Sequence, residues 1–516
     1  MKVFLLHPDR DFDLGAAPPW NEAALIQDLE LGTLLDAMAQ GDAFLRTIAQ
    51  RALLSSLADP PAIRYRQEVL RDCLASRGIV RAIYRTAVEA IGAESKQYLG
   101  VFSHHPEAIL HRAVTVVQML LQALEAIRHI ADVHAGSFAS DGWRRLFRML
   151  DAELDDEYLA LVRAHLRELR FRHGVLASAR LGKGNLGVDL VLRKPLEPPE
   201  SWLTRLLGQG RPGFTYHLHP RDESGARALS DLKQRALNPA ANALAQSADH
   251  ILSFLTVLRT ELAFYLGCVN LEEQLARIGM PTCVPEPLPA GGHSMACRRL
   301  YDACLALSTD RCVVGNDVRA EGKSLVIVTG ANQGGKSTFL RSTGLAQLMM
   351  QCGLFVPAEA FSADVCDGVI THYKREEDRS MRSGKLDEEL ARMSAIADRL
   401  TPNALILFNE SFAATNEREG SEIARQIVLA LHESGIKLLF VTHLYDFAHS
   451  LRDLGLDGAL FLRAERQPDG RRTFQIVEGE PQRTSHGADL YRRIFGVEAG
   501  ASPPAEANGH HLSAAA

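Results

Sequence analysis

One stretch of this chain, residues 324–341, constrains its fold more than any other. It reads SLVIVTGANQGGKSTFLR, and its first part is a short apolar run, rich in β-branched residues, of the kind that forms a buried parallel strand. A glycine-rich segment with the spacing Gly330-x4-Gly335-Lys336-Ser337 follows directly. The pattern predicts a strand, a tight loop and the first turn of a helix in direct succession.

The residue types in this loop are those that bind phosphate. Gly330, Gly334 and Gly335 lack a Cβ, so that successive N–H groups and the N-terminus of the next helix can face an anion at close range. Lys336 is placed to neutralise the β- and γ-phosphates, and the Ser337 hydroxyl is placed to ligate Mg²⁺. A glycine-rich turn without a ligand is the alternative, but the strand and helix on either side favour the phosphate-binding interpretation.

Two later strand ends carry polar residues that complete such a site. The apolar run 404–408 ends in Asn409 and Glu410, where proteins with this loop place a metal-associated acid and a general base. Asn409 offers an oxygen without a charge, so we expect weaker Mg²⁺ binding or slower turnover than with Asp. His443 follows the strand predicted at 438–442, within hydrogen-bonding reach of a γ-phosphate. A helix cap at 409–410 and an incidental histidine at 443 are the alternatives.

The sequence has no Asn-Lys-x-Asp element, the motif that recognises guanine, so ATP is favoured over GTP.

At 516 residues, the chain is long enough for two to four domains at about 100–200 residues each. We expect a multidomain protein with a mostly α-helical N-terminal part and an α/β P-loop ATPase domain. The expected domains are a helical region at 1–100, a second helical region at 101–285 with a small β insertion at about 175–220, the α/β domain at 293–500 and a disordered tail at 501–516. The Pro-rich segment 281–292 is the expected linker.

Within the α/β domain, the pattern predicts strands at 325–329, 369–373, 405–409 and 438–442 and helices at 336–352, 387–400 and 420–434. A turn at 467–470 predicts an antiparallel hairpin between 459–463 and 473–478. In the first half, two further strands are expected between 175 and 193, a long helix at 109–130, and another helix from about 226.

Composition narrows the classes of function. The net charge of -6 gives no global basic signal, so a nucleic-acid surface would have to be a local patch. Arginines gather between 143 and 173, but acidic residues lie among them, which favours a solvated, salt-bridged helix face over a DNA-contacting patch. The eight cysteines include no CxxC pair, which favours reduced core thiols. No run approaches the roughly 18 apolar residues of a membrane span, so we expect a cytoplasmic protein without a membrane partner.

These motifs resemble those of the MutS mismatch-repair ATPases, which are relatives of the ABC ATPases. The resemblance covers about 313–496 and implies an ABC-like form of the P-loop ATPase domain. It extends more weakly into the helical region before it, and there it implies a helical core and lever at 101–285. It is carried by the segments 329–338 and 353–359, Ser383-Gly384, Glu410 with 415–420, Thr442-His443, and Ser485-x-Gly487.

The resemblance implies ATP and Mg²⁺ as cofactors and assigns several residues. It implies that Glu410 is the base, that His443 senses the γ-phosphate, and that Ser337 and Asn409 lie at the metal. The remaining nucleotide contacts that it implies are Asn316, Ala331, Asn332, Gln333 and Thr338. It also implies a dimer in which Ser383 and Gly384 approach the nucleotide of the partner.

The chain departs from the family pattern in several places. Family members that read mismatches carry an N-terminal Phe-x-Glu wedge, and the first hundred residues here contain none. Lys385-Leu386-Asp387 replaces the usual Ser-Thr, which weakens the expected contact to the partner's γ-phosphate, and Val313 stands where an aromatic residue would stack on adenine.

We expect an ATP-hydrolysing homodimer, or a heterodimer with a longer MutS-type protein, that binds DNA without a wedge. An ATP-switched protein-interaction scaffold that does not bind DNA is the main alternative. A small-molecule kinase is a third, against which the hydrolase-like positions of Glu410 and His443 count.

Overall fold

The structure is a computed structural model that describes residues 1–98, 106–171, 174–185, 187–193, 216–331, 333–375, 384–467 and 472–481. Its contacts divide the chain into two compact units. The first unit comprises Met1–Pro287, Ala306–Cys312 and Leu348–Val356, and the second comprises Leu288–Leu305, Val313–Gln347 and the chain from Pro357. The boundary at Pro287 falls inside the Pro-rich segment 281–292, which also holds the short strand β3 (Glu286–Leu288).

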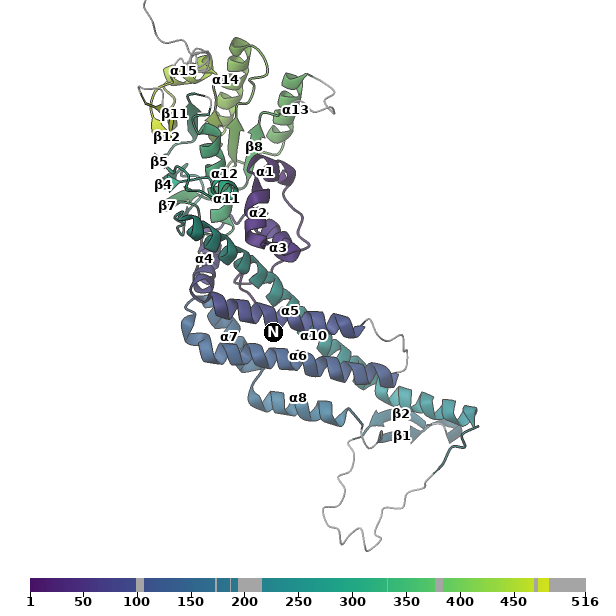
Figure 1. The fold of residues 1–516 in the computed structure, drawn as a ribbon. Helices are drawn as coiled ribbons and strands as arrows, with labels where there is room; N and C mark the ends of the chain where they lie inside the picture. The colour runs from purple at the N-terminus through teal and green to yellow at the C-terminus, as the bar shows by residue number, and fades with distance from the viewer. Residues whose placement is uncertain are drawn as a thin grey trace, which may run out of the picture. The chain divides into compact units, whose positions relative to one another are not determined.

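The first unit is built from helices around one long helix, α10 (Glu223–Ile278) (Figure 1). Helices α5 and α6 run along α10, and α2 and α3 also pack against it. The other helices of this unit are α1 (Glu22–Asp28), α2 (Leu31–Ala39), α3 (Ala43–Leu54), α4 (Pro60–Ala75), α5 (Arg77–Tyr98), α6 (Pro106–His134), α7 (Asp141–Glu153) and α8 (Asp156–Glu168). The predicted long helices at 109–130 and from about 226 are confirmed.

Helix α10 lies at the centre of the first unit because it carries apolar residues at helical spacing. Leu255, Leu258, Leu262 and Tyr265 are all fully buried, as a core-facing stripe requires. Among the described residues, α10 contains an 18-residue window that is long and apolar enough to cross a membrane by length and composition, and 67% of that window is buried within the protein. Arg259 and Glu261 interrupt the apolar residues of this part of α10, and burial against neighbouring helices accounts for those apolar residues.

The predicted pair of strands between 175 and 193 is confirmed as an antiparallel hairpin. Strand β1 (Ala177–Leu181) pairs with β2 (Gly187–Leu192), and Ala177 lies opposite Leu192. The hairpin lies against α10 within the first unit. The rest of the predicted insertion as far as residue 215 lies outside the described residues.

The N-terminal segment of the first unit is fixed by a carboxyl group of α10. Glu261 Oε2 accepts hydrogen bonds from the N–H groups of Leu5 (2.7 Å) and Leu6 (3.1 Å), and its Oε1 accepts one from Phe12 N–H (2.9 Å). Burial raises the pKa of Glu261 to about 7, although the three N–H groups act in the opposite direction. The fully buried Arg66 donates from Nε to the carbonyl of Leu6 (2.7 Å), so the same segment is bound from two helices.

The second unit contains a six-stranded sheet with the order β12-β11-β6-β10-β9-β8. Five strands are parallel, and β12 (Arg472–Glu478) is antiparallel to β11 (Ala459–Arg466). The parallel strands β6 (Leu325–Thr329), β8 (Val369–Tyr373) and β9 (Leu405–Asn409) have the predicted bounds, and β10 (Lys437–Val441) begins and ends one residue earlier than predicted. The predicted closing hairpin is also confirmed. The multidomain arrangement of a largely helical part followed by an α/β part is thus present.

Four helices accompany the sheet: α12 (Lys336–Gln351), α13 (Lys385–Ala397), α14 (Glu417–Glu433) and α15 (Tyr445–Asp453). Helices α13 and α14 begin two and three residues earlier than the apolar pattern indicated. Asn416 caps α14 by accepting from Glu419 N–H (3.0 Å), which explains the earlier start, since a polar cap lies outside an apolar periodicity. A second sheet, with the order β3-β7-β4-β5, is formed by β3, β4 (Met295–Leu300), β5 (Asn316–Arg319) and β7 (Ala360–Asp364), and α11 (Ala303–Thr309) follows β4.

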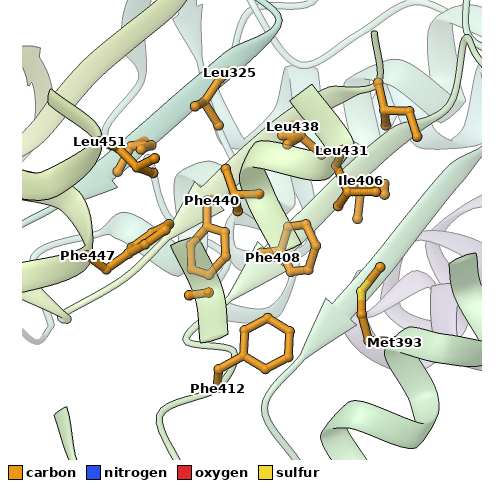
Figure 2. Close-up of a cluster of buried hydrophobic side chains, with 14 of the residues drawn as sticks. Leu325, Met393, Ile406, Phe408, Phe412, Leu431, Leu438, Phe440, Phe447 and Leu451 are labelled. Carbon is orange, nitrogen blue, oxygen red and sulfur yellow. The ribbon is translucent and has the colours of Figure 1, made fainter. Parts of the chain in front are cut away.

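A large cluster of buried hydrophobic residues in the second unit lies on one face of the six-stranded sheet. Figure 2 shows Phe408 of β9, Phe440 of β10 and Phe447 of α15 gathered there, with ring centroids 4.9 Å and 4.8 Å apart in successive pairs. This packing fixes the register of the central strands, in which Val441 lies opposite both Val328 and Asn409. The loops that follow β6, β9 and β10 therefore leave the same edge of the sheet next to one another, where α/β proteins place their ligands.

Candidate active site

The glycine-rich loop joins β6 to α12, as the sequence predicts. Gly330 and Gly335 have φ values of 121° and 93°, which L side chains rarely adopt. At Gly334 a Cβ would lie 2.8 Å from Ala464 Cβ of β11, so the loop passes too close to the neighbouring strand to admit a side chain there. The backbone at this turn thus depends on glycine.

Lys336 begins α12 and turns its ammonium group back into the loop. Its Nζ donates to the carbonyls of Gly330 (2.9 Å) and Ala331 (3.0 Å), and only 4% of the residue is exposed. Burial lowers the pKa of Lys336, an effect that the Glu410 carboxyl opposes. A cation held in the loop at the N-terminus of a helix makes this turn strongly attractive to an anion.

Ser337 and Asn409 bring two oxygens together beside the loop. The Ser337 hydroxyl donates to Asn409 Oδ1 over 2.8 Å, although the residues are 72 positions apart in the sequence. Hydroxyl and amide oxygens are the hard ligands that Mg²⁺ takes, and the loop N–H groups and Lys336 are donors suited to phosphate. The residues present therefore fit a magnesium nucleotide.

Glu410 and His443 lie together at the ends of the neighbouring strands β9 and β10. Glu410 Oε2 is 3.8 Å from His443 Nδ1, and both side chains are partly exposed. His443 is the main cause that lowers the pKa of Glu410; Lys336 and Lys374 add to its effect, and burial opposes it. Glu410 is thus held ionised, the form in which a carboxylate can accept a proton from water.

The remaining predicted residues that the structure describes lie on several elements of the second unit. Gln333 lies in the loop, where its Oε1 accepts from Arg472 Nη1 (2.6 Å), and Thr338 lies in the first turn of α12. Gly384 is the N-cap of α13. Asn316 lies on β5, and its Oδ1 accepts from Ile476 N–H (2.7 Å), so its described contact joins β5 to β12. Asn332, Ser383, Ser485 and Gly487 lie outside the described residues.

Phe474 is a further residue at the loop, and it was not predicted from the sequence. This residue of β12 has a φ of 60° and is 47% exposed. It lies beside the loop, because a Cβ on Gly335 would lie 3.6 Å from Phe474 Cβ. The antiparallel hairpin was predicted, but nothing in the local pattern indicates that its second strand returns to the glycine-rich loop.

Comparisons with known proteins cover both units. Residues 58–278, from α4 through α10, match the family model of the MutS2 N-terminal domain. Residues 326–492, which include the glycine-rich loop, Asn409, Glu410 and His443, match the model of MutS domain V. The chain belongs to the MutS family.

Individual relatives agree with this membership. The DNA mismatch repair protein MutS of Chloroflexus aurantiacus is 32% identical over 196 residues, which are 37% of this chain and 20% of that protein. The protein of the same name from Thermus aquaticus is 34% identical over 180 residues, or 34% of this chain and 22% of the relative. Endonuclease MutS2 of Lacticaseibacillus casei is 29% identical over 255 residues, or 46% of this chain and 31% of the relative. This MutS-family chain thus spans less than a third of the length of these relatives.

Proposed function

We propose that this MutS-family protein binds and hydrolyses ATP with Mg²⁺ and acts as a dimeric, cytoplasmic clamp on DNA in mismatch repair or related DNA maintenance. The observation that carries the ATPase assignment is the convergence of Lys336, the Ser337–Asn409 pair and Glu410 with His443 at one edge of the parallel sheet. That edge lies in the segment that matches MutS domain V.

Each residue has a distinct role in the proposed reaction. Lys336 and the loop N–H groups bind the β- and γ-phosphates, and Ser337 and Asn409 hold Mg²⁺, which supplies charge neutralisation. Glu410 orients a water molecule and accepts its proton as the water attacks the γ-phosphorus. His443 donates a hydrogen bond to a γ-phosphate oxygen and keeps Glu410 ionised until that proton arrives. Phe474, exposed beside the loop, offers a ring on which adenine can stack.

The DNA part of the proposal rests on family membership. Several of the clustered arginines already have partners: Arg163 Nη2 lies 2.6 Å from Glu125 Oε1, Arg145 donates to the carbonyl of Pro8, and Arg170 donates to Gln118 Oε1. This pairing favours the second candidate function, an ATP-switched scaffold that binds protein partners and not DNA. A heterodimer with a longer MutS-type protein is compatible with either function.

Steady-state ATPase assays separate the two candidates. The purified protein is assayed at low salt with duplex, mismatched, branched and single-stranded DNA and without DNA, and binding is followed by gel shift over a salt series. Stimulation by one DNA form, with binding that weakens steeply as salt rises, supports the clamp. Hydrolysis that no DNA changes, without any shift, supports the scaffold. Absence of ATP binding and hydrolysis under all conditions contradicts the ATPase assignment itself.

A further inference from the structure

The turn that carries Glu410 is strained. Glu410 and Phe412 have φ values of 52° and 62°, in the left-handed region that residues other than glycine rarely adopt. They flank Ser411, so two left-handed residues lie within three positions directly after β9. Such a backbone persists only when surrounding contacts hold it, and it directs the side chain of Glu410 toward His443.

Three hydrogen bonds hold this turn. Glu410 N–H donates to the carbonyl of Val441 (2.9 Å), which attaches the turn to β10. Phe412 N–H donates to Glu389 Oε2 of α13 (2.7 Å), and the Ser411 hydroxyl donates to the carbonyl of His372 on β8 (2.5 Å). Ser411 and Phe412 are fully buried and Glu389 is 5% exposed, so water cannot replace these partners.

The side chain of His372, a residue of β8, contacts the same turn. Its Nδ1 lies 2.7 Å from Ser411 Oγ, and its Nε2 lies 3.1 Å from the carbonyl oxygen of Glu389 and 3.4 Å from Arg392 Nη2. Burial, with the Arg392 charge, lowers the pKa of His372 to about 4, so the ring is neutral at pH 7. The neutral ring carries one proton, either on Nδ1 beside Ser411 Oγ or on Nε2 beside the Glu389 carbonyl. Through its two nitrogens the ring therefore contacts both the turn and α13.

We propose that Glu389 is a positioning residue for Glu410. Its buried carboxyl holds the Phe412 N–H, His372 and Ser411 hold the residue between, and together they keep the strained turn in the geometry that aims Glu410 at the attacking water. This inference rests on the proposed ATPase function. Because Glu389 lies on α13, a displacement of that helix reaches the general base through one side chain and one short turn. The structure thereby assigns α13 a direct influence on the rate of hydrolysis, separate from nucleotide binding.

The test compares substitutions at Glu389 that differ only in whether an acceptor remains. Glu389→Ala leaves the Phe412 N–H without a partner, whereas Glu389→Gln retains an amide oxygen that can accept it. Glu388→Ala, at the next position of α13, is the matched control because no described side-chain hydrogen bond involves Glu388. Ser411→Ala removes the second hydrogen bond independently. For each variant the kcat and KM for ATP, the Kd for a non-hydrolysable ATP analogue and the unfolding temperature are measured.

We expect Glu389→Ala to lower kcat by about tenfold while the KM and the Kd stay within about twofold of the wild type. Glu389→Gln should recover most of kcat, and Ser411→Ala should lower it in the same manner as Glu389→Ala. Equal kcat in Glu389→Ala and Glu388→Ala overturns the inference, as does a loss of kcat in Glu389→Ala that Glu389→Gln does not recover. A wild type that binds no ATP analogue and hydrolyses no ATP contradicts the proposed function instead, so the two failures are distinguishable.

Discussion

Replacing Asn409 by Asp adds one negative charge beside Ser337 and leaves the shape of the side chain almost unchanged. The carboxylate retains an oxygen that can accept the Ser337 hydroxyl, which now lies 2.8 Å from Asn409 Oδ1. The substitution therefore tests charge alone, without creating a cavity or leaving a polar group unpaired.

The magnitude follows from this geometry. With Ser337 as a direct ligand at about 2.1 Å and residue 409 holding the water shell of the metal, the new charge lies roughly 4–5 Å from Mg²⁺. At the dielectric constant of water, a unit charge at that distance from a divalent ion contributes about 2 kcal/mol, or about 20-fold in affinity. The gain of about 20-fold in Mg²⁺ affinity is a lower limit, because Asn409 is partly buried and a dielectric constant below that of water strengthens the attraction.

The assay is ATP hydrolysis as a function of free Mg²⁺ at constant ATP. The Mg²⁺ concentration for half-maximal rate should fall about 20-fold in Asn409→Asp. Asn403→Asp is the matched control: it makes the same change six residues earlier, near the other end of β9, about 20 Å away and beyond the Debye length of about 8 Å. An unchanged Mg²⁺ requirement in Asn409→Asp, or an equal change in Asn403→Asp, would refute the reasoning and show that the metal is held by other groups.

Four further predictions concern single residues. Lys336→Ala should abolish ATP binding measured by titration calorimetry, while Lys323→Ala, at the other end of β6, should not; full affinity in the first variant contradicts the assignment of the loop. Glu410→Gln should bind ATP but hydrolyse it about 10²–10⁴-fold more slowly, and undiminished turnover removes Glu410 from the mechanism. Phe474→Ala should raise the KM for ATP about tenfold with kcat unchanged, since stacking contributes about 1–3 kcal/mol per base; an unchanged KM excludes Phe474 from the base site. The unfolded carboxyl of Glu261 loses its proton near pH 4.5 and the folded one near 7, so the wild type should lose about 3 kcal/mol of stability relative to Glu261→Gln as pH rises through that window. The free energy of unfolding is measured in urea at a series of pH values. If it changes with pH in the same way in both proteins, the prediction is wrong.

Much of the fold of the second unit follows from local sequence. The strands β6, β8 and β9 are short runs rich in apolar and β-branched residues, and their bounds were predictable because nearly all of their side chains are buried. Helix starts were less predictable. Asn416 caps α14, which begins three residues before the expected start, since a cap depends on a side-chain hydrogen bond that apolar periodicity does not report.

The candidate site could be predicted only in part. The loop residues and Glu410 belong to short motifs in which residue type and spacing indicate the chemistry, so the sequence alone predicted them as site residues. Phe474 and Glu389 were not predicted, because each contacts a residue that is far away in the sequence. Glu389 holds a backbone N–H 23 positions later, and this contact depends on the strained conformation of Phe412, a residue whose type gives no indication of a left-handed backbone.

The sequence by itself determined the residues of the candidate site: a lysine and a serine in a glycine-rich turn after a buried strand, and a glutamate and a histidine at the ends of two later strands. These features are local, since strand burial, glycine conformations and side-chain types are properties of a few consecutive residues. The tertiary structure alone decided which strand ends meet. The order β12-β11-β6-β10-β9-β8 brings Asn409 to Ser337 and Glu410 to His443, and Glu261 binds the N-terminal segment 256 residues away at Leu5. The physical reason is that such pairings depend on the packing of the whole core, and each buried polar group must find its partner wherever the fold places one.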